Sequence, residues 1–432
     1  MPVCEKKGKH LTIARVKQRS GGEMVLILAV LLTSLGAQLR LSPVSGADWP
    51  QIHGPNRNGV AADEQIDSTP SPRWRFPVGQ GYAGPAVVDS VVYLFHRVGN
   101  VERLDALDLD TGKRLWKVDF DATYRGGINP DSGPRCVPLV HQDRIILFGA
   151  AGVAHAVDRK TGAKLWTRDL YGDYRGQEGY FGAGSTPVAV DDRVLFNVGG
   201  RPSAGLVALS LSNGKTLWSS TDEGASYSSP AVASVRGNPS VVFLTRYNAV
   251  AVNPQNGKVA FRFPFGRRGP TVNAATPIVI QDRLFLTSSY QVGAALLNLK
   301  APDQAIWEND RSLSSQYNTP VAKDDFLYGI HGREDVGSAD LRCIETGTGR
   351  VVWSQPNFGV ANLILVGDQL VAITNEGELI IAKASPSQYS EIGRYRVSKH
   401  STRALPALSQ GRLLVRDNQG DEGELICLDL RP

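Results

Sequence analysis

The chain has few cysteines, and none of them lies in a pattern that binds a metal or a haem. Its four cysteines are scattered, at Cys4, Cys136, Cys343 and Cys427. No Cys-x-x-Cys, Cys-x-x-Cys-His or adjacent cysteine pair occurs. Zinc sites, attached haem and redox dithiols are therefore not indicated.

An excess of one charge sign is also missing once the amino-terminal segment is set aside. The full chain carries 47 Lys and Arg against 42 Asp and Glu. Residues 1–47 hold seven of the former and two of the latter, which leaves 40 of each in the rest. A neutral surface gives no electrostatic reason to expect nucleic acid or an anionic membrane as a partner.

No apolar run is long enough to favour a full membrane span. The longest, residues 24–36, follows a basic stretch and precedes Ser45-Gly46-Ala47, which has the pattern of a cleavage site. We expect residues 1–47 to be a secretory signal peptide, which would place the protein in the periplasm or outside the cell. The alternative is that this segment is an uncleaved anchor. In that case it would be the only part of the protein that contacts a membrane.

Signatures of catalysis are absent as well. No Gly-x-Ser-x-Gly elbow occurs, so no serine is predicted to be a nucleophile. The histidines after residue 47 lack the i, i+2 or i, i+4 spacing of metal ligands; they are His53, His96, His141, His155, His331 and His400. The sequence therefore predicts no catalytic residue, no metal site and no bound cofactor.

What the chain does contain is a repeated phrase of strand, tight polar turn and strand ending in an aromatic residue. It reads ALDLDTGKRLW at 106–116 and AVDRKTGAKLW at 156–166, and looser copies follow at 208–218, 251–261 and 343–353. A unit of this size cannot bury its own apolar face, so it must stack on its neighbours.

Each phrase is preceded by a strand opening, usually a proline, which fits the first position of a strand. The openings are Pro85, Pro138, Pro187, Pro230, Pro277, Pro320, Leu363 and Pro406. Their spacings are 53, 49, 43, 47, 43, 43 and 43 residues, a period typical of propeller blades. We therefore predict an all-β, eight-bladed β-propeller with four-stranded antiparallel blades. The last blade lacks an outer strand, and residues 72–76 around Trp74 are predicted to supply it and close the ring.

The phrase resembles the repeat of pyrroloquinoline-quinone-type (PQQ-like) propellers over roughly residues 72–430. The resemblance implies that the repeat's tryptophan and glycine dock one blade on the next. The residues concerned are Trp74, Trp116, Trp166, Trp218, Trp307 and Trp353, with Gly112, Gly162, Gly214, Gly257 and Gly349.

Two branches of this family imply two functions. One contains the propeller subunit of the outer-membrane β-barrel assembly machinery and other non-enzymatic scaffolds. The other contains dehydrogenases of alcohols or sugars that bind PQQ with calcium. Many of those enzymes have a pair of adjacent cysteines, which is absent here.

The chain is thus divided into residues 1–47, an extension at 48–71 and a propeller at 72–432. The extension begins DWPQIHGPNRNG, similar to the opening of many secreted relatives of these propellers. It is interpreted as a cap or contact element, or as a segment in which Trp49 only anchors the terminus on the ring.

The predicted binding surface lies on the links between blades, because loops on a rigid scaffold carry binding residues. Two adjacent links are long, at 119–135 and 169–185, and both contain Tyr-Arg-Gly. Tyrosine and arginine are typical of interface hot spots. The candidates are Tyr124, Arg125, Arg135, Tyr171, Asp173, Tyr174, Arg175, Glu178 and Tyr180, with Arg267 and Arg268 from a third link. The alternative is that these loops pack on each other and bind nothing.

The sequence therefore favours an exported, monomeric propeller that binds a protein or another ligand through loops at the channel mouth, without catalysis. The alternative is a PQQ-dependent dehydrogenase.

Overall fold

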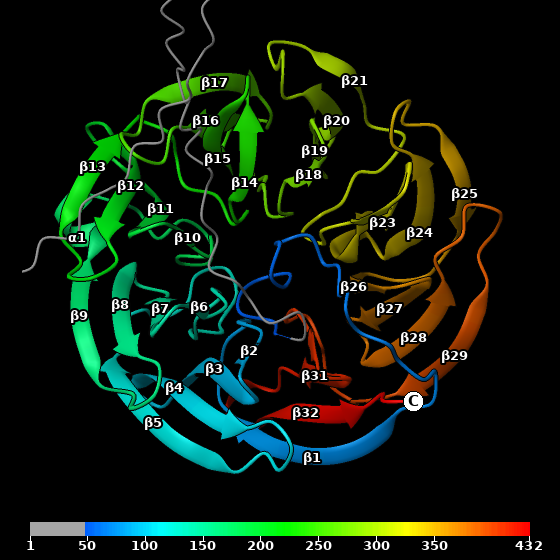
Figure 1. Ribbon diagram of the computed structural model, residues 1–432, viewed down its shortest axis with the longest axis horizontal. Coiled ribbons are helices and arrows are strands. Elements are labelled where there is room, and N and C mark those ends of the chain that lie inside the picture. Colours follow the sequence, from blue (N-terminus) through cyan, green and yellow to red (C-terminus); the bar gives the residue numbers. More distant parts are fainter. Residues whose placement is uncertain (1–47) are drawn as a thin grey trace, which may run out of the picture. The chain divides into compact units, whose positions relative to one another are not determined.

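The computed structural model describes residues 48–432, and the predicted signal peptide or anchor at 1–47 lies outside them. The described residues form eight four-stranded antiparallel sheets around a ring (Figure 1). The prediction of an eight-bladed, all-β propeller is confirmed. Within residues 48–432, no helix is both long and apolar enough to cross a membrane.

The first four blades follow one another along the chain, each running from an inner to an outer strand. Their strands are β2 (Ala86–Val88), β3 (Val91–Val98), β4 (Val101–Asp108) and β5 (Arg114–Asp121); β6 (Leu139–His141), β7 (Arg144–Phe148), β8 (Val153–Asp158) and β9 (Lys164–Asp169); β10 (Val188–Val190), β11 (Arg193–Gly200), β12 (Ala204–Ser210) and β13 (Thr216–Ser220); β14 (Ala231–Val235), β15 (Asn238–Leu244), β16 (Asn248–Val252) and β17 (Val259–Pro264).

Blades 5 to 8 continue the ring, and the last takes its outer strand from the start of the described chain. Their strands are β18 (Ile278–Ile280), β19 (Arg283–Ser288), β20 (Gly293–Asn298) and β21 (Ala305–Asn309); β22 (Val321–Lys323), β23 (Phe326–Arg333), β24 (Ser338–Glu345) and β25 (Val351–Gln355); β26 (Ala361–Val366), β27 (Gln369–Thr374), β28 (Glu378–Lys383) and β29 (Glu391–Arg396); β30 (Ala407–Ser409), β31 (Arg412–Arg416), β32 (Gly423–Asp429) and β1 (Ser71–Val78). The short helices are α1 (Leu170–Tyr174), η1 (Glu334–Val336) and η2 (Gly420–Glu422).

The inner strands begin where the sequence predicts. In seven blades the strand starts at the residue after the proline, as at Ala86 after Pro85. In blade 7, which has no such proline, β26 starts at Ala361, two residues before Leu363. A proline has no N–H to give to a ladder, so it fixes the first position of a strand, whereas other residues leave that position free.

The ring closes by the predicted joining of the two ends. In blade 8, β1 pairs antiparallel with β32, with Trp74 opposite Cys427 and Pro72 opposite Leu428. This pairing covers the edge of β32 that would otherwise be open to another chain.

Neighbouring blades meet where a tryptophan lies over a glycine of the next blade. A Cβ atom added at Gly162 would lie 2.7 Å from the Trp116 ring, and one at Gly112 would lie 2.6 Å from the Trp74 ring. Both glycines have a positive φ, of 72° and 68°. These positions favour glycine for two reasons, because a side chain would be strained there and would collide with the indole.

The extension crosses the inner strands on one face of the ring. Trp49 is 2% exposed, and Arg57, 3% exposed, donates hydrogen bonds to backbone carbonyls at the start of β10. The segment contacts five blades, through Trp49 with Val87, Pro50 with Val140, Arg57 with Pro187, Val60 with Leu365, and Glu64 with Gly411. It therefore runs across the centre of the ring on this face (Figure 1).

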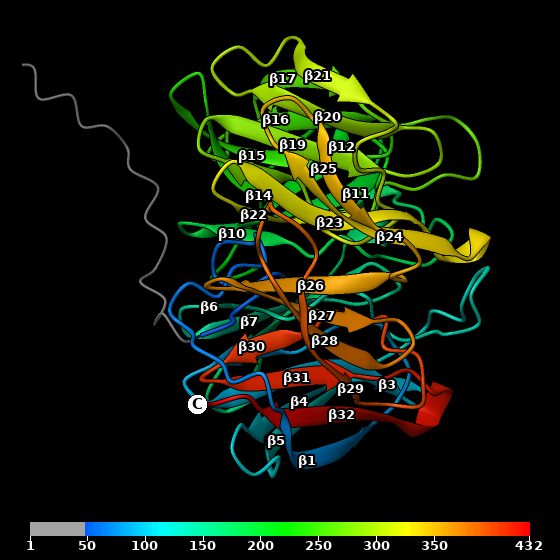
Figure 2. The same ribbon diagram turned by 90° about the vertical axis from the view of Figure 1, so that its right-hand side faces the viewer.

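The two faces of the ring differ in the connections that they carry. The links from each outer strand to the next inner strand share one face with the hairpins between second and third strands. We call this the link face. In Figure 2 the β23–β24 hairpin points to the right, toward the link face, and the extension lies at the left.

Candidate functional site

The link face carries two long links, one from blade 1 to blade 2 and one from blade 2 to blade 3. Residues 122–138 join β5 to β6, and residues 170–187 join β9 to β10. The second link opens with α1, whose first turn is capped by Asp169, since its carboxylate accepts from Gly172 N at 2.9 Å. The helix ends at Tyr174 and is capped by Arg175, which has a left-handed backbone conformation.

The two links pack together as one ordered unit. Ile128 N donates to the Tyr180 carbonyl at 3.3 Å, and Ala183 N donates to the Ala150 carbonyl at 2.9 Å. The Tyr227 hydroxyl accepts from the backbone N–H groups of Tyr180 and of its neighbour at 2.9 and 3.0 Å. These bonds tie the second link to the first link, to blade 2 and to the link that enters blade 4.

Beneath the links lie a buried arginine and a buried acid. Arg97, 4% exposed, donates through Nη1 to the carbonyls of Tyr124 and Ser132 and so holds the first link. Glu102, also 4% exposed, accepts from Ala150 N at 2.9 Å. Burial raises the pKa of Glu102 to about 7, against the smaller opposing effects of its hydrogen bond and of nearby Arg97 and Arg135.

A row of alternating aromatic rings and guanidinium groups lies over the link face. The Arg135 guanidinium carbon is 5.4 Å from the Tyr124 ring centroid and 5.6 Å from that of Tyr82. Arg403 continues the row, 5.5 Å from Tyr82 and 5.6 Å from Tyr317. Stacking of this kind favours the charged guanidinium and fixes the planes of the rings.

Carboxylates complete this row at both ends. Asp131 pairs with Arg135 at 3.4 Å and accepts from Gly81 N at 2.9 Å. Glu334 forms an ion pair with Arg403 and accepts from the Tyr317 hydroxyl at 3.1 Å.

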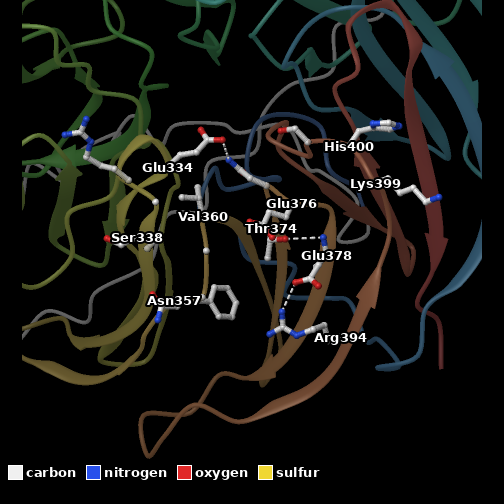
Figure 3. Close-up of a pocket in the computed structure, with 17 residues that line it drawn as sticks. Glu334, Ser338, Asn357, Val360, Thr374, Glu376, Glu378, Arg394, Lys399 and His400 are labelled. Atoms are coloured by element: carbon white, nitrogen blue, oxygen red, sulfur yellow. Dashed lines mark hydrogen bonds and ion pairs between the residues drawn. The ribbon is translucent and has the colours of Figure 1, made fainter.

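Three of the hollows in the described part of the chain open on the link face. One of about 690 Å³ lies between blades 6 and 7, and Figure 3 shows Glu334, Glu378, Arg394 and Lys399 around it. A second, of about 540 Å³, lies against the second long link and the β11–β12 hairpin. The third, of about 620 Å³, lies between the links that enter blades 5 and 6.

The structure places the candidate contact residues in two layers. Tyr124 and Tyr171 are buried at 3% and 9% exposed, and Arg135 and Tyr174 are half-buried. The others are exposed: Arg125, Asp173, Arg175, Glu178, Tyr180, Arg267 and Arg268. Asp173 forms an ion pair with Arg168 at 2.6 Å.

Several residues of this site are not found by reasoning from the sequence. Tyr82, Tyr317 and Arg403 lie on three other links, and they meet only because the ring brings those links together. Arg97 and Glu102 belong to ordinary strands, where no spacing signals a buried charge. The only sign in the sequence is that each is a charged residue at a strand position expected to face inward.

The mouth of the channel does not offer the ligand set that calcium and a quinone would need. Its carboxylates at Asp131 and Glu334 are already held by arginines, and the central ring of Tyr82 lies between two guanidinium groups. Within residues 48–432, no group of three or more His, Cys, Asp and Glu side chains is placed so that it could hold a metal ion. The residues present therefore do not fit the quinone site that the dehydrogenase alternative implies.

Comparison with known proteins shows the same fold and identifies a family. A family model described as outer membrane protein assembly factor BamB matches residues 99–355, more than half of the chain. A curated protein of that name from Burkholderia pseudomallei is 24% identical over 358 residues, which cover 70% of this chain and 85% of that protein.

Among solved structures, BamB from Moraxella catarrhalis superposes with a TM-score of 0.62 at 15% identity, covering 84% of this chain and all of that one. Quinohemoprotein alcohol dehydrogenase from Comamonas testosteroni superposes with a TM-score of 0.66 at 14% identity, covering 88% and 80%. At such low identity these two likenesses show the fold alone.

Proposed function

The chain belongs to the family described as outer membrane protein assembly factor BamB, and on that premise we propose that it is an exported, non-catalytic scaffold that binds a protein partner through its link face. Curated relatives of comparable length carry the name of outer-membrane protein assembly factors. We extend that role to this chain, with residues 1–47 directing export and residues 72–432 forming the scaffold.

The observation that carries the proposal is the unit formed by the two long links. It presents the exposed side chains of Arg125, Arg175, Glu178 and Tyr180 over a buried layer that contains Tyr124. Aromatic and arginine side chains on a preorganised support lose little conformational entropy on binding, which is why they are frequent in interface hot spots.

The rigidity of this unit supports the same conclusion. Tyr180 is 37% exposed, yet its backbone forms hydrogen bonds with Tyr227 from the link that enters blade 4 and with Ile128 from the other long link. A loop that only connected two strands would need none of these bonds.

Photocrosslinking at Tyr180 tests the proposal. A photoreactive amino acid at this position, in the bacterium that makes the protein, should attach to a component of the outer-membrane assembly apparatus. The control is the same residue at Leu217, which is 43% exposed on the outer strand β13. Adducts of equal yield and identity at both positions, or none at either, would refute the proposed surface.

A second measurement tests the role in assembly. Deleting the gene should lower the amount of β-barrel protein in the outer membrane, and the wild-type chain should restore it. Replacing Arg175 and Tyr180 with Ala should abolish this rescue and leave the melting temperature nearly unchanged, because both side chains are exposed.

A further inference from the structure

Most arginines of residues 48–432 have a carboxylate partner or are buried on backbone carbonyls. Arg412, for example, pairs with Asp110 and Asp429, and Arg416 donates to the carbonyls of Ala83 and Gly79. Eight other arginines are exposed or half-buried and form no ion pair with any described residue: Arg125, Arg175, Arg201, Arg246, Arg267, Arg268, Arg283 and Arg311. Arginine is always charged at neutral pH, so these eight side chains are uncompensated positive charges.

Seven of the eight lie on the link face, in consecutive blades. They occupy the links at 122–138, 170–187, 265–277 and 310–320 and the hairpins at 201–203 and 245–247. We call these seven residues the arginine arc: Arg125, Arg175, Arg201, Arg246, Arg267, Arg268 and Arg311. The eighth, Arg283, begins β19 on the opposite face.

The carboxylates near the arc neutralise only part of it, because most of them form ion pairs with other arginines. The ion pairs of these segments are Asp131 with Arg135, Asp173 with Arg168, Glu223 with Arg262, Glu334 with Arg403, and Asp335 with Arg333. Asp222 and Asp310 accept hydrogen bonds from neutral donors, Ser203 N and the Ser314 hydroxyl, so both keep their negative charge. The side chains of Asp121 and Glu178 form no hydrogen bond or ion pair with a described residue, and these four carboxylates without an ion pair are fewer than the seven arginines of the arc.

The arc borders two hollows that could receive side chains. Arg175, Arg201 and Arg246 line the hollow of about 540 Å³, and Arg267 and Arg268 line that of about 620 Å³. Arg246 connects the two hollows. It lines the first, and its guanidinium donates to Gly269 O at 2.8 Å and to the hydroxyl of Thr271, which lines the second, at 3.0 Å.

We propose that the arginine arc binds an extended acidic segment of a protein partner, with carboxylate side chains entering the two hollows. This inference rests on the proposed function, for which it specifies the chemistry of the partner. A planar guanidinium binds a carboxylate through two parallel hydrogen bonds, and such bonds are stronger where the hollow excludes part of the solvent.

The alternatives of a nucleic acid and a lipid surface fit the structure less well. Residues 48–432 carry equal numbers of basic and acidic residues, and the arc lies on part of one face, with five of its seven arginines lining two separate hollows. A polyphosphate backbone or an anionic membrane is typically bound by a larger basic surface with a net positive charge.

Fluorescence anisotropy with a labelled peptide of alternating Glu and Ser tests the proposal on the purified chain. The wild-type protein should bind this peptide, and binding should weaken as salt is raised. A peptide of alternating Gln and Ser should not bind. Replacing Arg201 and Arg268 together with Gln should weaken binding about fivefold to tenfold, which corresponds to about 0.5–0.7 kcal/mol for each exposed charge pair. The control Arg283→Gln removes an equally exposed, unpaired arginine from the other face and should change nothing.

Other outcomes would overturn the inference. Equal affinity for the Gln peptide, or equal loss in the Arg283 variant, would show that the arc does not select carboxylates. Tighter binding of a single-stranded oligonucleotide or of phosphatidylglycerol vesicles would assign the arc to those ligands instead. If the Glu peptide does not bind while the Tyr180 crosslink persists, only this inference fails; loss of the crosslink as well would refute the proposed function.

Discussion

Replacing Glu102 with Gln should raise the stability of the protein at neutral and higher pH. The carboxyl is buried under both long links, where Oε1 accepts from Ala150 N. Its pKa rises from the ordinary value of 4.5 to about 7 on folding, mainly because burial disfavours the charged form. A rise of this size corresponds to about 3 kcal/mol of lost stability once the group is ionised in the folded state.

The direction in which stability changes with pH follows from proton binding to Glu102. Between pH 4.5 and about 7 the folded protein holds a proton on Glu102 that the unfolded chain has released, so the free energy of unfolding falls as pH rises through this window. Gln carries no charge and keeps the carbonyl that accepts from Ala150 N. The Glu102→Gln variant should therefore match the wild type near pH 4 and exceed it by about 3 kcal/mol at pH 8.

Urea unfolding of both proteins over this pH range measures the effect. The difference between the two curves isolates Glu102, because other buried groups titrate in both, such as His155, whose pKa burial lowers to about 3. Glu178→Gln, at an exposed position of the neighbouring link, is the control and should leave the curve unchanged. Parallel curves for wild type and Glu102→Gln would refute the reasoning.

Two further substitutions test how the ring is held together. Trp49→Ala removes a buried indole from the extension and should cost about 3–5 kcal/mol, which lowers the melting temperature by about 4–6 °C for a domain of this size, whereas Leu115→Ala at an exposed position should not change it. An unchanged melting temperature for the Trp49 variant would mean that the extension contributes nothing to the fold. Gly162→Ala and Gly237→Ala both place a side chain at positive φ, but only at Gly162 would the new Cβ collide with the Trp116 ring. Calorimetry should therefore show a larger loss of stability at Gly162, and equal losses would refute a docking role for that contact.

The sequence is most informative where the structure is repetitive. The blade number, the strand order and the closure through Trp74 all follow from a period that returns at every proline opening. Each unit must bury its faces against its neighbours, so a local pattern that repeats along the chain specifies how all the units stack into one ring. The same argument fixes which positions of the repeat take glycine.

The positions of the site residues cannot be predicted in this way, because the links between blades do not repeat in length or sequence. The sequence identifies two long links rich in tyrosine and arginine, but not which rings point inward. Tyr124 and Tyr171 are buried as supports, whereas Tyr180 and Arg175 remain exposed. That choice depends on how the two links pack against each other and against blade 4.

By itself, then, the amino-acid sequence determined the fold, since apolar alternation and turn residues act over a few positions at a time. Only the tertiary structure decided which charges remain unpaired. Arg201 and Arg268 lie 67 positions apart and look no different in the sequence from the arginines that form ion pairs. Closing the ring brings their loops to one face, and the positions of the surrounding carboxylates leave these two without a partner.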